Sequence, residues 1–422
     1  MIDITAMIKQ IGQQAKQAAR ELAWASGDKK NRALILMAQS LRDQAGILIA
    51  ANQLDLIRAE QQNLTPAMLD RLRLTEAHIE GMAEGLSQIA QLPDPVGAID
   101  HMRRMVNQMQ VGQMRVPLGV IGIIYESRPN VTADAAGLCL KSGNAVILRG
   151  GSEAIHSNRA ITTCLIQALV ETGLPKHAIQ FIDTIDRNAV GLLLKTPQYI
   201  DVIIPRGGKE LIQRIMAESH IPVIKHLDGN CHTYVDSHAD LEQAFALTLN
   251  GKMQRTGVCN ATETLLVHAD IAKKFLPKMA KLLHEAGCEL RVCELSRKLI
   301  GKTIPVQTAT AEDWDCEYLG PILAIRVVES IQAALDHIEA HSSRHTEVIV
   351  TQDHQRAMRF LRQVDSAAVL VNASSRLNDG FQFGLGAEIG ISTDKLHVRG
   401  PVGLEGLTCQ KYVVFGDGQI RS

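Results

Sequence analysis

Apolar residues recur with a helical period through the first part of the chain, residues 1–92. In Ile8–Leu22 they fall near every third or fourth position, and the same spacing continues through Leu34–Leu48 after a break at Gly27-Asp28. Pro93–Pro95 then interrupts the pattern, as prolines do at the end of a helical region. We expect this part to be helical. It is rich in alanine and glutamine and offers few side chains suited to catalysis.

A different pattern follows, because residues 98–113 alternate loosely between apolar and polar side chains. Methionine supplies several of the apolar positions. The alternation predicts a hairpin that projects from the body of the protein, and a last strand is predicted at Leu407–Phe415. Exposed methionines on a hairpin would suit a contact between subunits, and the last strand is expected to pair across such an interface.

Strands and helices alternate from Pro117 onward. Four short apolar runs predict buried strands, at residues 119–125, 144–149, 178–182 and 201–205. Continuous apolar strands separated by helices are typical of a parallel sheet covered on both faces. Ligands of such sheets lie beyond the carboxyl ends of the strands.

The chain from His226 onward repeats this alternation, with strands predicted at residues 264–268, 347–350 and 368–371 and after Glu317. Asp270 is expected to cap an amphipathic helix that follows the strand at residues 264–268. We therefore predict the α/β class. Two parallel-sheet domains would face each other across a cleft, and a small oligomerisation hairpin would project from them.

Composition excludes several classes of function. The chain has 422 residues, 46% of them hydrophobic, and a formal charge of −1, which is ordinary for a globular protein with a sizeable core. Near-zero charge offers no general attraction to nucleic acid or to an anionic membrane. No apolar run is long enough to cross a bilayer, and the N-terminus lacks the pattern of a signal peptide. These features favour a cytoplasmic protein without a nucleic-acid or membrane partner.

One cysteine has the surroundings of a nucleophile. The eight cysteines show no C-x-x-C spacing, so they predict neither a disulfide scaffold nor a metal site. Cys259 lies in a polar loop, with Gly257 two residues before it and an apolar strand after it. A thiol can attack an acyl carbon without a strong base beside it, because about a few per cent is thiolate near neutral pH. Cys259 is the candidate nucleophile, and a packed core cysteine is the alternative.

Two strands of the first sheet end in Arg-Gly-Gly immediately before a predicted helix. Backbone N–H groups at a helix start and the positive end of its dipole suit a phosphate group. Neither turn matches the G-x-G-x-x-G fingerprint, and a tight connection is the alternative for each. Ser152 is expected to cap the helix after the first turn. The candidate cofactor-binding residues here are Arg149, Gly150, Gly151, Ser152, Pro205, Arg206, Gly207 and Gly208.

The cysteine loop resembles the nucleophile loop of the aldehyde dehydrogenase superfamily. The features that carry the resemblance are the glycine before Cys259, the apolar strand after it, and Glu317-x-x-Gly-Pro further along the chain. From about Pro117 to the C-terminus the chain is similar to one branch of that superfamily, the γ-glutamyl phosphate reductases of proline biosynthesis. The resemblance implies an NADP-dependent phosphorylating aldehyde dehydrogenase that forms a thioester on Cys259.

The same resemblance implies roles for other residues. Asn130 matches an asparagine that holds the developing oxyanion together with the N–H of the nucleophile, and Arg128 is the alternative. Arg149 matches a position that contacts the adenosine ribose. Ser152 stands where many NAD-using members have a glutamate, which favours NADPH as the cofactor. Glu317 matches a glutamate that binds the nicotinamide ribose.

A glutamate that hydrolytic members use to activate water is missing, because His226 or Leu227 falls at its position. A lone histidine is most often structural, so His226 receives no role. The absence suits an acyl phosphate, since water would destroy the thioester. The resemblance thus implies reduction of L-glutamyl 5-phosphate to L-glutamate 5-semialdehyde and phosphate, with Arg255 and Arg399 as candidate substrate ligands.

Two other functions stay open on the sequence. A coenzyme A-acylating aldehyde dehydrogenase would also lack the glutamate, and a nucleotide-binding protein that has lost catalysis would keep the same fold. Phosphate dependence of the reverse reaction separates the first from the reductase, and thiol-dependent oxidation of NADPH tests the second. The resemblance also implies a homo-oligomer and delivery of the substrate from glutamate 5-kinase.

The sequence divides into three kinds of segment. Residues 1–99 and 117–225 are predicted to form the dinucleotide-binding domain, and residues 226–398 the catalytic domain with the cysteine. Residues 100–116 and 399–422 are the predicted oligomerisation elements.

Overall fold

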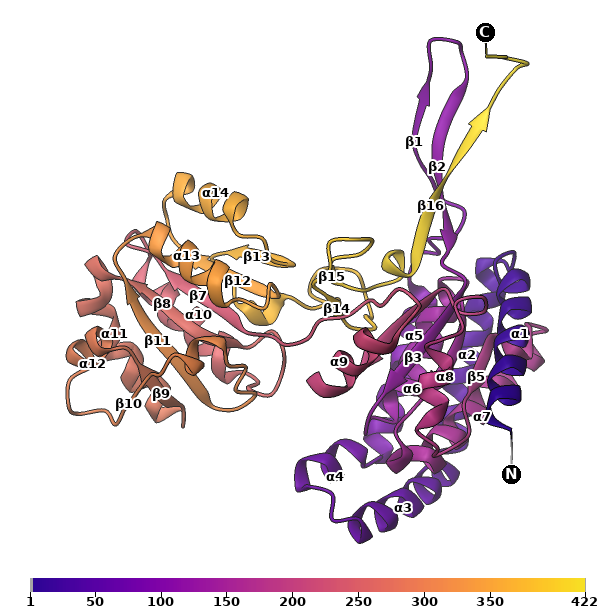
Figure 1. The fold of residues 1–422 in the computed structure, drawn as a ribbon, viewed down its shortest axis with the longest axis horizontal. Coiled ribbons are helices and arrows are strands. Elements are labelled where there is room, and N and C mark those ends of the chain that lie inside the picture. Colours follow the sequence, from indigo (N-terminus) through magenta and orange to yellow (C-terminus); the bar gives the residue numbers. More distant parts are fainter. Residues whose placement is uncertain (1–2, 422) are drawn as a thin grey trace. The chain divides into compact units, whose positions relative to one another are not determined.

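The computed structural model describes residues 3–421, except for the side chains of residues 66 and 67. The predicted domain limits at residues 1 and 422 lie outside the described residues. Contacts divide the chain into two compact units (Figure 1). The first unit comprises Met1–Lys225, Gly384–Gly390 and Val402–Ser422, and the second comprises His226–Phe383 and Ile391–Pro401. Residues 384–390 thus pack with the first unit, whereas the sequence analysis includes them in 226–398.

Five helices precede the first sheet, which confirms the helical prediction for this part of the chain. Polar side chains fix where two of them begin, because Asp3 accepts two backbone N–H groups at the start of α1 and Ser26 accepts one at the start of α2. The helices are α1 Ile4–Leu22, α2 Gly27–Asp43, α3 Ala45–Gln61, α4 Pro66–Leu72 and α5 Glu76–Gln91.

A parallel sheet of four strands forms the centre of the first unit, in the order β5-β4-β3-β6. All four strands predicted here are present. Side chains on one face of the sheet, such as Ile124 and Ile203, share a buried cluster with Ile8 of α1 and Leu193 of α8. The strands are β3 Val120–Tyr125, β4 Ala145–Arg149, β5 Ile179–Phe181 and β6 Val202–Arg206. The helices are α6 Asn130–Lys141, α7 Ile155–Glu171, α8 Asn188–Leu193 and α9 Lys209–Glu218.

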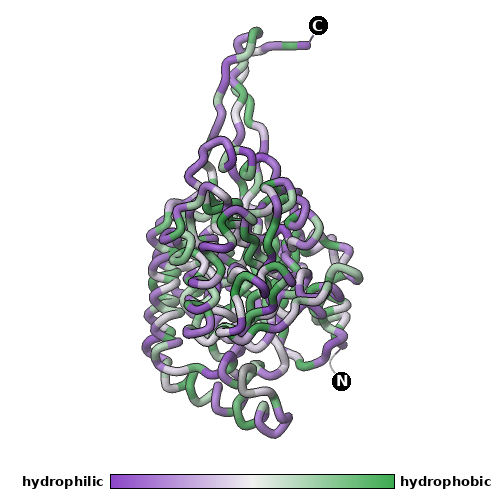
Figure 2. The backbone as a smooth tube through the Cα atoms, turned by 90° about the vertical axis from the view of Figure 1, so that its left-hand side faces the viewer, coloured by the Kyte–Doolittle hydropathy of each residue, from purple (hydrophilic) through white to green (hydrophobic). Residues whose placement is uncertain are grey.

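The predicted hairpin is a three-stranded antiparallel arm that extends from the rest of the first unit (Figure 1). Its strands are β1 Ile99–Arg104, β2 Gln110–Pro117 and β16 Thr408–Phe415. Hydrophilic and hydrophobic positions are interspersed along the arm (Figure 2), and most of its side chains are at least partly exposed. β16 pairs along its length with β2 of the same chain and forms the outer strand of the sheet. Its pairing with another subunit through its outer edge stays a prediction.

The second unit contains a sheet of seven parallel strands, in the order β10-β9-β11-β8-β7-β12-β13. Its largest apolar cluster includes Phe245 and Phe275, whose stacked ring centroids lie 4.9 Å apart. The strands are β7 Cys231–Val235, β8 Thr262–His268, β9 Glu289–Val292, β10 Gln307–Thr308, β11 Ile322–Val328, β12 Thr346–Val350 and β13 Ala368–Val371. The helices are α10 Leu241–Met253, α11 Ala269–Glu285, α12 Glu294–Ile300, α13 Ile331–His341 and α14 His354–Gln363.

The prediction that Asp270 caps α11 is wrong. His268 is the N-cap residue, and its Nδ1 accepts from the backbone N–H of Asp270, 3.2 Å away. Asp270 lies in the first turn, where its negative charge still suits the helix dipole.

Short elements complete the chain. β14 Ile391–Ser392 and β15 Gly400–Pro401 form an antiparallel pair. The 3₁₀ helices are η1 Ser152–Ala154, η2 Lys176–Ala178, η3 Glu312–Asp315, η4 Ser375–Leu377 and η5 Glu405–Leu407. No single helix within residues 3–421 is long and apolar enough to cross a membrane, and only α2 and α3 as a pair, bent by 69°, pass a test of length and composition. Two helix-covered parallel sheets confirm the predicted α/β class.

Candidate active site

Cys259 lies in the loop between α10 and β8 and is half-buried. His226 lies in the segment before β7, and His345 immediately precedes β12. The strands β12, β7 and β8 are parallel neighbours in the sheet, so the segments that lead into them meet at its amino edge. The fold therefore brings together one thiol and two imidazoles that are far apart in the sequence.

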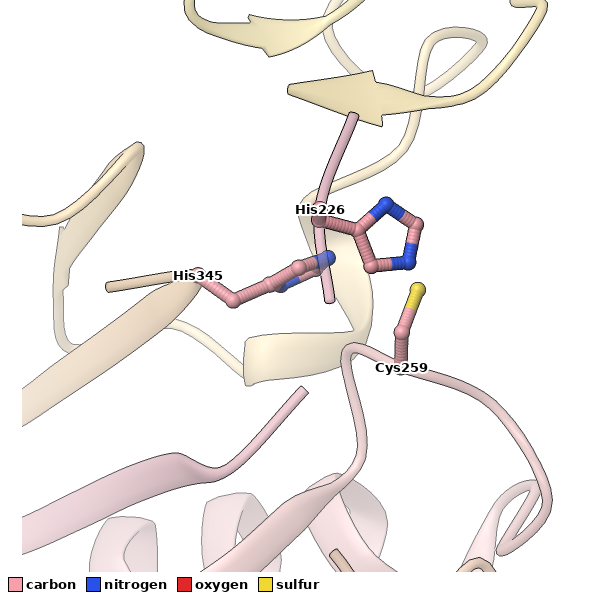
Figure 3. Close-up of side chains that lie close together, drawn as sticks. All are labelled: His226, Cys259 and His345. Carbon is pink, nitrogen blue, oxygen red and sulfur yellow. The ribbon is translucent and has the colours of Figure 1, made fainter. Parts of the chain in front are cut away.

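The three side chains form a close cluster in the second unit. One ring nitrogen from each histidine and the Cys259 sulfur all lie within 4.8 Å of one another. The two imidazole rings meet edge to face, with centroids 5.3 Å apart and planes at 71°. Figure 3 shows the sulfur of Cys259 pointing at the ring of His226, with the ring of His345 beside that ring.

The backbone fixes which nitrogen of His226 carries its proton. Nδ1 lies 2.9 Å from the carbonyl oxygen of Ile391, and a carbonyl oxygen only accepts hydrogen bonds. Nδ1 is therefore protonated, and Nε2 of the neutral ring carries a lone pair. Nε2 is the nitrogen that faces the sulfur in Figure 3. His226 is thus oriented to accept the proton of the Cys259 thiol, a role that the sequence alone did not reveal.

His345 is fully buried beside this pair. Burial, together with the nearby ring of His226, lowers the pKa of His345 to about 3, so the ring is neutral near pH 7. Its Nδ1 contacts the hydroxyl oxygen of Thr346 at 2.7 Å. Its Nε2 makes no hydrogen bond to any described residue, and in Figure 3 it points toward the His226 ring and Cys259.

Close backbone contacts hold the cysteine loop in place. A Cβ atom on Gly229 would lie 1.9 Å from the carbonyl oxygen of Cys259, so only glycine fits at this position. The Gly229 N–H donates to Glu317 at 2.9 Å, and the Cys231 thiol donates to the Cys259 carbonyl at 3.1 Å. Glu317 therefore lies beside the nucleophile segment, and its predicted contact with the nicotinamide ribose stays a prediction.

A buried ion pair joins the two ends of the cysteine loop. Lys252, near the end of α10, bonds to Glu263, near the start of β8, and both side chains are fully buried. Glu263 also accepts from the Leu319 N–H at 3.3 Å. Burial raises the pKa of Glu263 to about 7, against the opposite effect of Lys252. The sequence does not predict this pair, because Lys252 directly follows Asn250-Gly251 and Glu263 lies between two threonines, so neither charge interrupts an apolar run.

Two arginines, the candidate Arg255 and also Arg376, lie near the nucleophile. Burial lowers the pKa of Arg376, and the positive charge of Arg255 lowers it further, whereas Cys259 raises it. Because charges affect one another's pKa only at short range, Arg376, Arg255 and Cys259 are close together. The Arg376 Nε donates to Gln254 at 2.9 Å, and Arg255 is exposed. An anion that reaches Cys259 therefore meets positive charge.

Arg399 is engaged elsewhere in the second unit. Its Nη1 donates to the Asp365 carboxylate at 2.6 Å, and its Nη2 donates to the Asp365 carbonyl at 2.9 Å. A substrate anion would have to share Arg399 with this carboxylate. Its predicted contact with substrate stays a prediction.

Arg149 ends β4 as a buried residue of the first unit. Its Nη1 donates to the carbonyl of Gly150, its Nε has no hydrogen-bond partner in the described chain, and burial lowers the pKa of its guanidinium. Glu153 is turned away into another contact, because it accepts from the backbone N–H of Ser127 at 2.6 Å and from the Ser127 hydroxyl at 2.8 Å. The carboxylate that follows Ser152 in the sequence is thus already bound.

The prediction that Ser152 caps α7 is wrong. Ser152 begins η1 and makes no cap hydrogen bond, whereas Asp55 of α3 accepts from the amides of His156 and Ser157 at 3.1 and 2.8 Å. Asp55 is itself fully buried. Its carboxylate occupies the positive end of α7, the position where an anion is most stabilised.

A carboxylate also binds at the second Arg-Gly-Gly turn. The Gly208 amide, at the N-terminus of α9, donates to Glu126 at 2.9 Å. A Cβ atom on Gly207 would lie 2.5 Å from the same carboxylate. A phosphate at this turn would compete with Glu126, so phosphate binding at the two turns stays a prediction.

Asn130, the candidate oxyanion ligand, begins α6 in the first unit and is exposed. Its Nδ2 donates to Asp134 at 3.1 Å. The alternative, Arg128, is exposed two residues earlier. Asn130 and Arg128 both belong to the first unit, whereas Cys259 belongs to the second. The choice between Asn130 and Arg128 as the oxyanion ligand stays open.

Comparison with known proteins identifies the family. A model of the aldehyde dehydrogenase family matches residues 4–289. A γ-glutamyl phosphate reductase from Magnetococcus marinus is 64% identical over 420 residues, which is 100% of this chain and 99% of that protein. The crystal structure of the γ-glutamyl phosphate reductase from Thermotoga maritima has a TM-score of 0.95 at 41% identity and covers 98% of this chain and 100% of that one. An acetylating aldehyde dehydrogenase from Geobacillus thermoglucosidasius shares the fold at 18% identity, with a TM-score of 0.70 and coverage of 100% and 99%.

The chain therefore belongs to the aldehyde dehydrogenase family, whose members are oxidoreductases that use a nicotinamide cofactor. Within that family, the two relatives with the higher identities above are both γ-glutamyl phosphate reductases, which confirms the resemblance seen in the sequence.

Proposed function

We propose that this enzyme reduces L-glutamyl 5-phosphate to L-glutamate 5-semialdehyde and phosphate with NADPH, the second step of proline synthesis from glutamate. The names of the relatives support this substrate. The observation that carries the proposal is Cys259, a loop thiol whose sulfur faces the proton-accepting nitrogen of His226. A thiol paired with a base is the arrangement that acyl transfer through a thioester requires.

The proposed chemistry begins with transfer of the thiol proton from Cys259 to Nε2 of His226. The thiolate attacks the acyl carbon, and Asn130 and the Cys259 N–H hold the oxyanion that forms. The carbon–oxygen bond to phosphate then breaks, the proton on His226 passes to the leaving phosphate, and a thioester remains. NADPH, when bound, would supply the hydride that converts the thioester to a thiohemiacetal. Collapse of the resulting thiohemiacetal releases the aldehyde and the thiolate, which regains a proton from solvent.

The first unit offers residues that fit NADPH. Arg149 has a buried Nε without a hydrogen-bond partner among the residues that the structure describes, and burial of such a cation is offset when it binds an anion. Ser152 carries no charge that would repel a 2′-phosphate, and Glu153 is already bound by Ser127. These residues favour the phosphorylated cofactor, with Arg206 at the second turn and Glu317 as a further ligand.

Positive charge near the nucleophile suits the proposed substrate, which carries a phosphate and a carboxylate. Arg255 and Arg376 lie close to Cys259 and to each other. We propose that they hold the phosphoryl group and that Arg399 binds the carboxylate end.

The remaining proposals concern the whole protein. Residues 1–99 and 117–225 would bind the cofactor, and residues 226–398 would carry catalysis. Residues 100–116 and 399–422, which include most of the exposed arm, would join subunits of a homo-oligomer. We place the enzyme in the cytoplasm, where it would take its unstable substrate from glutamate 5-kinase.

The reverse reaction tests the proposed function. The semialdehyde with NADP should give little reduced cofactor until inorganic phosphate is added, and no appreciable free glutamate, because no carboxylate base stands at position 226 to activate water. His226→Glu is expected to introduce some hydrolysis to glutamate. Steady production of glutamate without phosphate by the unmodified enzyme would overturn the proposal. Replacement of phosphate by coenzyme A as the required acceptor would instead identify an acylating aldehyde dehydrogenase.

A further inference from the structure

The cluster of His226, Cys259 and His345 has the composition of a zinc site. Thiolate sulfur and imidazole nitrogen are the preferred ligands of Zn²⁺, and three protein ligands with one open position are common where the metal is accessible. The sequence predicts no such site, because its three donors come from three separate loops. Only the order β12-β7-β8 in the sheet brings them together.

The distances are close to those that a bound ion would impose. Zn–N bonds of about 2.0–2.1 Å and a Zn–S bond of about 2.3 Å place tetrahedral donors roughly 3.3–3.6 Å apart. The three donors lie within 4.8 Å of one another. His226 and Cys259 are half-buried on loops, so small side-chain rotations suffice to close the remaining difference of about 1–1.5 Å.

His226 is held as metal-binding histidines usually are. Nδ1 of His226 bonds to the Ile391 carbonyl, and a backbone carbonyl in this position orients the ring with Nε2 available to a metal. His345 is fully buried with its Nδ1 at the Thr346 hydroxyl. Its Nε2 has no hydrogen-bond partner in the described chain and points into the cluster. A buried polar atom without a partner is costly, and a bound ion would satisfy it.

We propose that His226, Cys259 and His345 bind Zn²⁺ reversibly and that the bound ion inhibits the enzyme. The ion takes the thiolate as a ligand, the thiol proton goes to solvent, and neither the sulfur nor His226 is then available for acyl transfer. The ion is an inhibitor and has no part in the reaction. Inhibition rests on the proposed role of Cys259, whereas binding of the metal rests on the cluster alone.

The test uses the full chain freed of metal and titrated with Co²⁺, which reports its ligands by absorption. We expect one Co²⁺ per chain, with a thiolate-to-cobalt absorption band that Zn²⁺ abolishes and that Cys259→Ser lacks. His345→Gln should weaken metal binding by more than about tenfold, because loss of even a supporting partner of a ligand costs about 10–100-fold. Relative to its own activity in metal-free buffer, this variant should be inhibited correspondingly less by Zn²⁺.

His337→Gln provides a matched control. His337 is a second buried histidine of the same unit whose Nε2 lacks a partner among described residues, and its ring neighbours are His232, His341 and Trp314 rather than a thiol. Its replacement should leave metal affinity unchanged. Equal affinity in both variants, or absence of the thiolate band in the unmodified protein, would overturn the site.

A second measurement covers the case in which His345→Gln does not fold. Zn²⁺ should protect Cys259 of the unmodified protein from alkylation, as mass spectrometry of the labelled peptide reports, and unprotected labelling at saturating Zn²⁺ would also overturn the site. The two proposals fail separately. Phosphate-dependent activity that survives in Cys259→Ser would refute the proposed function, while the cobalt spectrum still judges the metal site.

Discussion

The two units are both parallel α/β sheets, yet they place their candidate chemistry at opposite edges. In the first unit the Arg-Gly-Gly turns follow β4 and β6, so they lie at the carboxyl edge, where helix N-termini gather. In the second unit His226, Cys259 and His345 precede β7, β8 and β12, so they lie at the amino edge. The usual rule for ligand sites in such sheets therefore finds the first set and misses the second.

The difference follows from what each edge supplies. The carboxyl edge offers helix dipoles and backbone N–H groups, and in the first unit two of these helix starts already hold carboxylates, those of Asp55 and Glu126. The amino edge offers no helix N-terminus, and Cys259 follows the end of α10 rather than the start of a helix. A thiol placed there needs another group to take its proton, and His226 is the group that the fold provides.

The strongest test of this comparison is Cys259→Ser. We expect turnover to fall by at least about a thousandfold, because a serine hydroxyl is far less acidic than a thiol and His226 alone is too weak a base to ionise it in this setting. Cofactor binding and the unfolding transition should be unchanged. Steady-state rates with thermal unfolding of the same samples measure both, and activity above a few per cent would refute the nucleophile.

His226→Gln should have the next largest effect. The glutamine side chain keeps hydrogen-bonding groups but takes no proton, so kcat/KM should fall by about 10²–10⁴ and its pH profile should lose the limb that belongs to the imidazole. His354→Gln, at an exposed position that begins α14, is the control and should behave as the unmodified enzyme. An unchanged pH profile in His226→Gln would mean that His226 only packs against the cysteine.

The first unit is probed by Asp55→Ala, which removes the carboxylate at the start of α7. Two backbone N–H groups and the Ser157 hydroxyl lose their acceptor in a buried setting. The free energy of unfolding should fall by about 2–3 kcal/mol, from the lost cap and the unsatisfied groups. Glu126→Ala is the matched change at α9, where the carboxylate is exposed, and should cost less than about 1 kcal/mol. Equal losses in a denaturant titration would contradict the difference in burial.

Local sequence patterns predict the strands, the helices and Cys259, because each of these leaves its signal within a few residues. The partners of the site leave none. His226 and His345 approach Cys259 only through the order of β12, β7 and β8, and Asp55 reaches Ser157 across 102 residues. The error at Ser152 has the same cause, since a better acceptor arrives from a distant helix.

A smaller effect is expected at the cofactor turn from Arg149→Ala. If the guanidinium binds a 2′-phosphate, Arg149→Ala loses a charge-assisted hydrogen bond. The Michaelis constant for NADPH should then rise by a factor that corresponds to about 1.5–3 kcal/mol of lost binding free energy. The constant for NADH should change little, which serves as the internal control. Initial rates with each cofactor decide, and equal changes for both would show that Arg149 does not distinguish them.

The smallest expected effect is the change in stability that acid causes through one buried carboxylate in each unit. Burial raises the pKa of Asp313, in the second unit, but hydrogen bonds from Arg291, Thr310 and Tyr318 outweigh it and bring the pKa to about 2. A lowered pKa stabilises the fold above the unfolded value of 3.8, so this contribution, about 1–2 kcal/mol, should disappear as the pH falls from about 4 to 2. Burial raises the pKa of Asp55, in the first unit, so its contribution has the opposite sign and favours the fold toward lower pH. Denaturant titrations from pH 5 to 2 measure the free energy of unfolding of each variant. The difference between the unmodified protein and Asp313→Asn should shrink as the pH falls, whereas the difference between the unmodified protein and Asp55→Asn should grow. Parallel curves for Asp313→Asn would show that its hydrogen bonds add nothing to stability.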